Sequence, residues 1–154
     1  MSEEKYQICE MLEMDSYGPV YKVMNKSDNS FSLMKSLPKK LLKNHNESFV
    51  LKQMEQLTSL NHINLSKYKD YFFNENNFNI VMEYDDESEL KSKLEYNKSN
   101  KLYFEENYLW SLIIQLLDVL KFFKNNKNIQ FELDTANILL MNNGKLKVYN
   151  YGFN

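Results

Sequence analysis

The chain is poor in several residue types, and each shortage excludes a class of protein. Its 154 residues include one cysteine, Cys9, which excludes an internal disulfide framework and a multi-cysteine zinc site. Its 19 basic residues are all lysine and are outnumbered by 21 acidic residues, so the excess positive charge of nucleic-acid-binding proteins is missing. The first residues, MSEEKYQ, contain no apolar stretch of a secretion signal. We therefore expect a cytoplasmic location, with the nucleus as the alternative.

The residues that are present have the proportions of a folded domain. Hydrophobic residues make up 43% of the chain and charged residues 26%, which is typical of one globular domain or a large part of one. In the first third, apolar-rich segments are separated by turns at 17–19 and 25–29, and these segments cover residues 6–14, 17–24 and 31–37. This spacing predicts an antiparallel meander of three strands.

Helical periodicity begins at residue 47. An i, i+4, i+7 stripe runs to residue 60 and consists of Val50, Met54 and Leu57, flanked by Phe49 and Leu60. This stripe predicts an amphipathic helix over residues 47–60. Residues 68–73 and 78–84 are apolar and flank the polar sequence Asn-Glu-Asn-Asn, so they predict a β-hairpin.

The second half is richer in helix. The acidic residues 85–89 are expected to cap a short helix over residues 89–96. Residues 108–123 are almost entirely apolar, with Ser111, Gln115 and Asp118 on one narrow stripe, which predicts a buried core helix too short to span a membrane. An Asn-Gly turn between residues 138–141 and 145–149 predicts a final hairpin.

Several short segments occur in an order that resembles the first part of a protein kinase domain. These segments are YGPVY at 17–21, SLMK at 32–35, HINL at 62–65, IVMEY at 80–84, QFELDTANILL at 130–140 and NYG at 150–152. The similarity is to Ser/Thr kinases, the NIMA-related group in particular, and it spans residues 6–154. It implies an α+β fold, with a kinase-like N-lobe over residues 1–84 and a partial helical C-lobe over residues 85–154. The N-lobe would hold a five-stranded antiparallel sheet and one helix.

The resemblance assigns a glycine-rich loop to the first turn. Gly18 takes the place of its last glycine and Val20 that of the valine that packs on adenine. Glu13 and Asp15 stand at the other glycine positions and bring like charge toward a triphosphate. On its own, this window is also typical of an ordinary strand, turn and strand.

Three further segments complete the implied nucleotide site. Lys35 corresponds to the lysine that holds the α- and β-phosphates. Gln53 takes the place of its glutamate partner, because helix geometry turns it inward while Glu55 points away. A Lys–Gln hydrogen bond would then replace an ion pair. At the end of the strand 78–84 lie the implied gatekeeper residue and two residues whose backbone would face adenine, namely Met82, Glu83 and Tyr84.

The catalytic segment departs most from the family. Glu132 stands at the position of the catalytic-base aspartate, Asp134 at that of a lysine, and Phe131 at that of an arginine. Asn137 matches the asparagine that binds a metal ion, and Asn150 replaces the metal-binding aspartate of D-F-G. An amide oxygen can coordinate Mg²⁺ but lacks the charge that holds the ion against water.

These substitutions predict a catalytically impaired pseudokinase or kinase fragment that acts by binding. ATP and Mg²⁺ are implied by the resemblance. The alternatives are a weakly active ATP-dependent Ser/Thr kinase and a gene fragment without a function of its own. The chain ends two residues after the NYG segment, so we expect the helix 108–123 to leave an apolar face that lowers solubility or is covered by a protein partner.

Overall fold

The computed structural model describes residues 4–14, 18–42, 46–84, 88–126, 129 and 133–152. The chain forms two compact units. The first contains residues 1–60 and 67–85, and the second contains residues 61–66 and 86–154. Predictions on several positions lie outside the described residues, namely Asp15, Tyr17, the acidic residues 85–87, Phe131 and Glu132.

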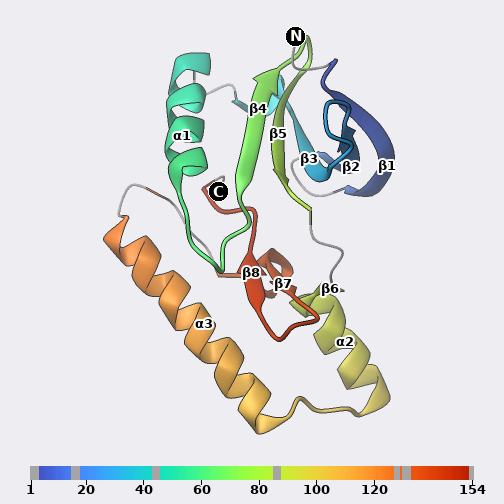
Figure 1. The fold of residues 1–154 in the computed structure, drawn as a ribbon, viewed down its shortest axis with the longest axis vertical. Helices are drawn as coiled ribbons and strands as arrows, with labels where there is room; N and C mark the ends of the chain where they lie inside the picture. Colours follow the sequence, from blue (N-terminus) through green and yellow to red (C-terminus); the bar gives the residue numbers. More distant parts are fainter. Residues whose placement is uncertain are drawn as a thin grey trace. The chain divides into compact units, whose positions relative to one another are not determined.

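The first unit is built on one antiparallel sheet (Figure 1). Its spatial order is β1-β2-β3-β5-β4, and every neighbouring pair is antiparallel. The predicted five-stranded sheet of an N-lobe is therefore confirmed. The strands are β1 (Tyr6–Met14), β2 (Pro19–Asn25), β3 (Phe31–Pro38), β4 (Tyr68–Phe73) and β5 (Asn77–Glu83), and a short 3-10 helix η1 (Lys39–Leu42) follows β3.

Asparagine side chains close the hairpins of this sheet. Asn25 Oδ1 accepts hydrogen bonds from the backbone N–H and the hydroxyl of Ser27, at 3.0 and 2.7 Å. Between β4 and β5, Asn74 Oδ1 accepts from the N–H groups of Asn76 and Asn77, at 3.2 and 2.8 Å. Such side chains accept hydrogen bonds from backbone N–H groups that have no backbone partner in a turn. This is why the polar, asparagine-rich segments form the turns.

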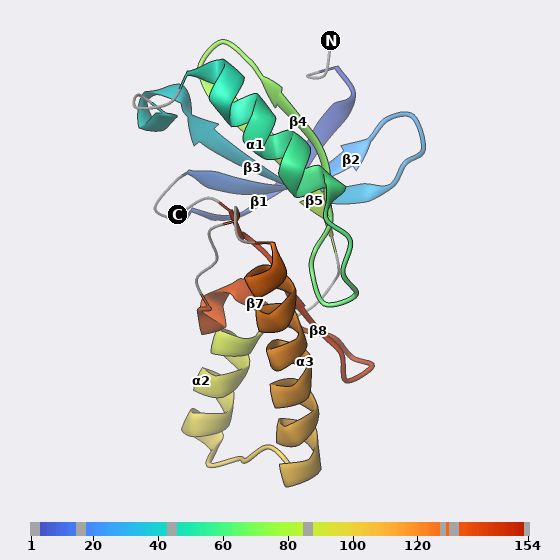
Figure 2. The same ribbon diagram turned by 90° about the vertical axis from the view of Figure 1, so that its left-hand side faces the viewer.

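Helix α1 (Glu47–Ser59) packs against β4, and both views show the two elements side by side (Figures 1 and 2). The Asn46 side chain caps the helix by accepting from Phe49 N at 2.7 Å. Its buried residues are the predicted stripe, Val50, Met54 and Leu57. Phe49, which flanks this stripe, lies in the first turn and is 51% exposed.

A small network ties the start of β1 to β4. Lys5 Nζ donates to Asp70 Oδ2 at 2.7 Å and Tyr6 Oη donates to the same oxygen at 3.0 Å. The Tyr6 ring also stacks on Phe72, with centroids 6.2 Å apart. Burial alone would raise the pKa of Asp70, but the hydrogen bonds from Lys5 and Tyr6 outweigh it and hold the pKa below its ordinary value of 3.8.

The Asp70→Asn variant is expected to lose about 1 kcal/mol of unfolding free energy at pH 7, because the ion pair is only partly shielded from solvent. A carboxyl with a lowered pKa stabilises the fold above its unfolded pKa, and this contribution disappears as pH falls. Variant and parent should therefore converge as the pH falls below the lowered pKa of Asp70. Urea unfolding at neutral pH and at low pH measures the difference. Glu75→Gln, at an exposed position of the β4–β5 turn, should match the parent throughout, and an undiminished Asp70→Asn deficit at low pH would contradict the assignment.

The second unit contains two long helices and a small sheet of order β6-β7-β8. Its elements are β6 (Ser88–Glu89), α2 (Leu90–Asn100), α3 (Glu106–Asn125), the 3-10 helix η2 (Thr135–Asn137), β7 (Ile138–Leu140) and β8 (Leu146–Val148). The predicted helix 89–96 begins one residue later, because Glu89 pairs with Leu139 as a strand residue. The predicted hairpin is present, and Gly144 has the positive φ of 80° that its turn requires.

Helix α3 buries less of its surface than a core helix would. Its buried residues are Leu112, Val119 and Phe123. Large apolar side chains elsewhere on it are 40–64% exposed, namely Leu109, Trp110, Ile113, Ile114, Leu117 and Leu120. The expectation of a fully buried helix is therefore wrong for this chain, whereas the expected exposed apolar face is present. Within the described residues, no helix is both long and apolar enough to cross a membrane.

Candidate functional site

Gly18 lies immediately before β2 and is pressed against the backbone of β3. A Cβ added at this position would lie 2.2 Å from the Ser36 carbonyl oxygen and 3.3 Å from Pro38 Cδ. The φ of Gly18 is +146°, which side chains rarely adopt. Glycine is thus required here by the close approach of two strands.

The strand register brings three predicted nucleotide residues onto one face of the sheet. Val20 on β2 is opposite Lys35 on β3, and Lys35 is opposite Ile80 on β5. Met82 is two residues beyond Ile80 and so shares its face. Val20, Lys35 and Met82 are 7%, 3% and 3% exposed. Lys35 therefore shares one buried face of the sheet with the apolar residues Val20 and Met82.

Helix α1 places Gln53 as the helical geometry predicts. Gln53 is partly buried and Glu55 is exposed. The residue on the inward side therefore carries an amide rather than a carboxylate. An amide can hydrogen-bond a lysine but supplies no charge to orient it, so the ion pair on which active kinases depend cannot form with this side chain.

The end of β5 holds the residues predicted to face adenine. The N–H of Glu83 donates to the Lys67 carbonyl at 2.9 Å, so this N–H is already used within the sheet. The Tyr84 ring lies 4.6 Å from Lys22 Nζ, which is also 4.8 Å from the Phe31 ring. Cation–π contacts therefore hold the side chain of Tyr84 against β2 and β3.

In the second unit, Asp134 has a local structural role. Its Oδ1 accepts from Ala136 N at 2.9 Å and from Thr135 Oγ1 at 3.4 Å. The carboxylate thus caps η2, as aspartate commonly does at the start of a helical turn. The side chain that stands at the lysine position is exposed, negatively charged and committed to this cap.

The two predicted metal-binding residues lie at the same end of the β7–β8 ladder. Ile138 pairs with Val148, and Tyr149 N donates to the Asn137 carbonyl just beyond them at 2.9 Å. Asn150 follows with a φ of 61°, a conformation that asparagine tolerates. Both side chains are neutral amides. Across the described ranges, no group of three or more His, Cys, Asp or Glu could hold a metal ion. Two neutral amide oxygens supply none of the carboxylate charge with which proteins usually hold Mg²⁺.

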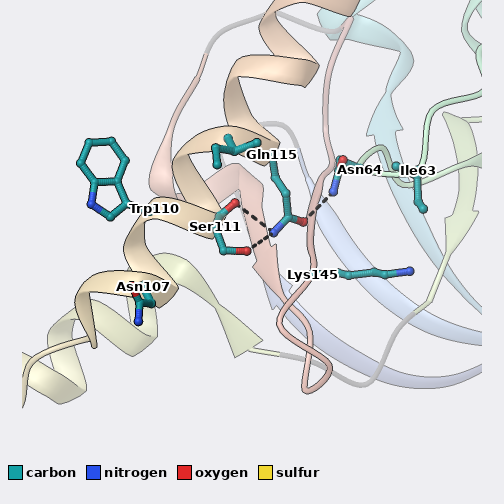
Figure 3. A pocket seen from close by; sticks show the side chains of 8 residues that line it. Ile63, Asn64, Asn107, Trp110, Ser111, Gln115 and Lys145 are labelled. Carbon is teal, nitrogen blue, oxygen red and sulfur yellow. Dashed lines mark hydrogen bonds between the residues drawn. The ribbon is translucent and has the colours of Figure 1, made fainter.

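A polar network that the sequence did not reveal fixes the β7–β8 turn to α3 (Figure 3). Gln115 Oε1 accepts from Asn64 Nδ2 at 2.9 Å and from Leu146 N at 3.0 Å. Gln115 Nε2 donates to the carbonyl oxygens of Gly144 at 3.1 Å and Ser111 at 3.2 Å. Asn64 Nδ2 also donates to Leu146 O at 2.9 Å. The sequence placed Gln115 on a polar stripe, but nothing in its pattern identified the partners.

Comparison with known proteins supports the resemblance. A family model described as "Protein kinase domain" matches residues 6–154. The chain is 28% identical over 137 residues to "Probable serine/threonine-protein kinase nek1" of Dictyostelium discoideum, covering 89% of this chain and 28% of that protein. It is 21% identical over 154 residues to the nek2 protein of the same organism, covering 97% and 37%. With "Serine/threonine-protein kinase PITSLRE" of Drosophila melanogaster it shares 29% identity over 156 residues, covering 98% and 16%. The chain thus spans less than half the length of each relative.

Proposed function

Because the chain belongs to the protein kinase domain family, we propose that it is a catalytically impaired member that acts by binding rather than by phosphoryl transfer. Asp134 carries this proposal. Its negative charge stands where active kinases have a lysine, and its carboxylate caps η2 instead of serving a ligand.

The physical reason is the nature of phosphoryl transfer. Kinases accelerate it almost entirely by positioning and by stabilising negative charge. A unit charge about 4 Å from a phosphoryl oxygen contributes about 4 kcal/mol at an effective dielectric constant near 20, or roughly a thousandfold in rate. Asp134 replaces that attraction by repulsion, and Gln53 and Asn150 supply no charge at their positions.

The proposed binding role rests on two surfaces that do not depend on the altered catalytic residues. Six large apolar side chains of α3 are 40–64% exposed. Because contiguous exposed apolar surface commonly marks an interaction site, we propose that a protein partner covers them. Nucleotide binding without turnover is compatible with this role, because Val20, Lys35 and Met82 share one buried face of the sheet.

That shared face also favours a second candidate function, a weakly active ATP-dependent kinase. In this alternative Lys35 holds the phosphates, while Asn137 and Asn150 supply amide oxygens toward a metal ion at one end of the β7–β8 ladder. The two candidates differ in one measurable respect. Only the second requires that Mg²⁺ strengthen nucleotide binding and that a substrate become phosphorylated.

Thermal unfolding of the full chain with ATP, with and without Mg²⁺, tests the choice. We expect no additional Mg²⁺-dependent stabilisation of the parent and no phosphorylation of a generic protein substrate. In the triple variant Glu132→Asp, Asp134→Lys, Asn150→Asp, restored charge should add a Mg²⁺-dependent increase in melting temperature of about 5 °C or more, because a ligand at about 100 times its Kd stabilises by about 2.7 kcal/mol.

Asp134→Asn is the matched control, because asparagine also caps helices but carries no charge. It should unfold at a temperature close to that of the parent. Mg²⁺-dependent stabilisation of the parent, together with substrate phosphorylation that Lys35→Ala abolishes, would establish the weakly active kinase and end the impaired-kinase proposal.

A further inference from the structure

A cavity of about 510 Å³ opens within the second unit, between α3, the segment 61–66 and the β7–β8 turn (Figure 3). Its apolar wall consists of Trp110, Ile114 and Ile63, which are 56%, 64% and 66% exposed. A second cavity of about 350 Å³ continues along α3 past Leu117 and shares Asn64, Ile114 and Gln115 with the first. Together they form one groove, called here the α3 groove.

Hydrogen bonds link the residues that form the floor of the α3 groove. Asn64 is 4% exposed, and its amide donates to Gln115 Oε1 and Leu146 O. Gln115 is bonded in turn to α3 and to the β7–β8 turn. Since the Asn64 and Gln115 amides already have hydrogen-bond partners within the protein, the surface left for a ligand is formed mainly by the apolar side chains beside them. A preformed apolar surface with few polar groups is typical of a binding site.

The charged residues along the groove are two lysines and one aspartate. Lys145 lines the first cavity and Lys121 the second. Neither ammonium has a hydrogen-bond or ion-pair partner among the described residues. The carboxylate of Asp118, also in the second cavity, is bonded to His62 Nε2 at 3.1 Å. Two ammonium groups against one carboxylate leave the lining of the groove with an excess of positive charge.

The spacing of the groove residues suits a helix. Trp110, Ile114, Leu117 and Lys121 follow an i, i+4, i+7, i+11 pattern on α3, which forms a straight stripe about 16 Å long at 1.5 Å per residue. An amphipathic helix laid along such a groove inserts its own apolar side chains at the same spacing. Three turns of helix would cover the stripe.

We propose that the α3 groove binds an amphipathic helical segment of a partner protein whose apolar stripe is flanked by Asp or Glu. The carboxylates would pair with Lys121 and Lys145 while the apolar stripe covers Trp110, Ile114 and Leu117. A second copy of this chain fits less well, because its own groove would bring the same lysines to the contact. The proposal rests on the binding function proposed above and names the partner's chemistry.

Three synthetic peptides of about 15 residues, enough for a helix longer than the stripe, serve as probes. One has a leucine stripe flanked by glutamates, the second has lysines in place of the glutamates, and the third has serines in place of the leucines. Fluorescence anisotropy with the full chain should show binding of the acidic peptide. Binding of the basic peptide should be at least about tenfold weaker, since each unpaired like charge is unfavourable, and the serine peptide should not bind.

Charge reversal supplies the decisive comparison. The double variant Lys121→Glu, Lys145→Glu should prefer the basic peptide, whereas Lys91→Glu on exposed α2 should leave the preference of the parent unchanged. Ile114→Glu should abolish binding of every peptide. Far-ultraviolet circular dichroism checks that each variant folds. If the charge-reversal variant does not fold, the double variant Lys121→Gln, Lys145→Gln takes its place. It should weaken the preference for the acidic peptide without reversing it.

Other outcomes overturn the proposal. These are the absence of binding by the acidic peptide, a charge preference that the reversal does not change, and binding that survives Ile114→Glu. A dimer in sedimentation that Ile114→Glu disperses, without peptide binding, would assign the groove to a second copy instead. Because these measurements contain no nucleotide, an active kinase with an intact groove preference would refute the impaired-kinase function and leave the groove proposal standing.

Discussion

Replacing Gly18 with alanine is expected to lower the free energy of unfolding of the first unit by about 3 kcal/mol or more. The added Cβ would lie 2.2 Å from the Ser36 carbonyl oxygen, where no atom can remain without a shift of the backbone. In addition, the φ of +146° strains any residue that has a side chain, at about 1–3 kcal/mol. Urea unfolding followed by circular dichroism measures the loss.

Gly144 provides the matched control for this change. It also has a positive φ, of 80°, but a Cβ there would have no atom within 4 Å. Gly144→Ala should therefore lose only the backbone term, about 1 kcal/mol. Hydrogen exchange should localise the Gly18→Ala effect to amides of β2 and β3. Equal losses in the two variants would show that steric contact with Ser36 does not determine the effect.

Gln115→Ala is expected to destabilise the second unit by about 3 kcal/mol. The change removes the acceptor of Leu146 N and the donor to Gly144 O, and leaves Asn64 Nδ2 with one partner instead of two. A buried polar group left without a partner is unfavourable by about 1–3 kcal/mol, and the bonds are partly shielded from water. Exchange of the Leu146 amide should rise more than that of amides in the middle of α3.

Ser111→Ala tests whether the effect belongs to the amide of Gln115. The Ser111 hydroxyl accepts a weak bond of 3.3 Å from Gln115 Nε2, which also bonds the Ser111 carbonyl. Because that carbonyl remains, the loss should stay below about 1 kcal/mol. If Gln115→Ala is as mild as Ser111→Ala, the network contributes little, and the β7–β8 turn is positioned by its apolar residues.

The periodicity of apolar residues correctly predicted the elements that bury a single face. The α1 stripe of Val50, Met54 and Leu57 is buried as its spacing indicates, and the asparagine-rich turns end the strands they follow. The short strand of Ser88 and Glu89 was not predicted. It exists only through pairing with Leu139 and Leu140, and local sequence does not encode such distant pairing.

For the candidate site, the family resemblance named Val20, Lys35 and Met82, and the strand register places them on one face of the sheet. The Gln115 network was not predictable, because the bonds of Gln115 to Asn64, Gly144 and Leu146 join residues between 29 and 51 positions apart. The cap formed by Asp134 had a local signal, an aspartate two residues before the N–H that it accepts. The family resemblance predicted only that Asp134 replaces a lysine, and it did not predict this cap.

Residues 61–66 interrupt the first unit in sequence yet belong to the second. Asn64 and Ser66 bond to Leu146 and Tyr151, which lie 82 and 85 positions later in the chain. At a translation rate of about 5–20 residues per second, those partners emerge from the ribosome on the order of ten seconds after this segment. The sheet of the first unit can form in the meantime. Vectorial synthesis thus imposes a waiting period during which the connection between α1 and β4 lacks its Leu146 and Tyr151 partners.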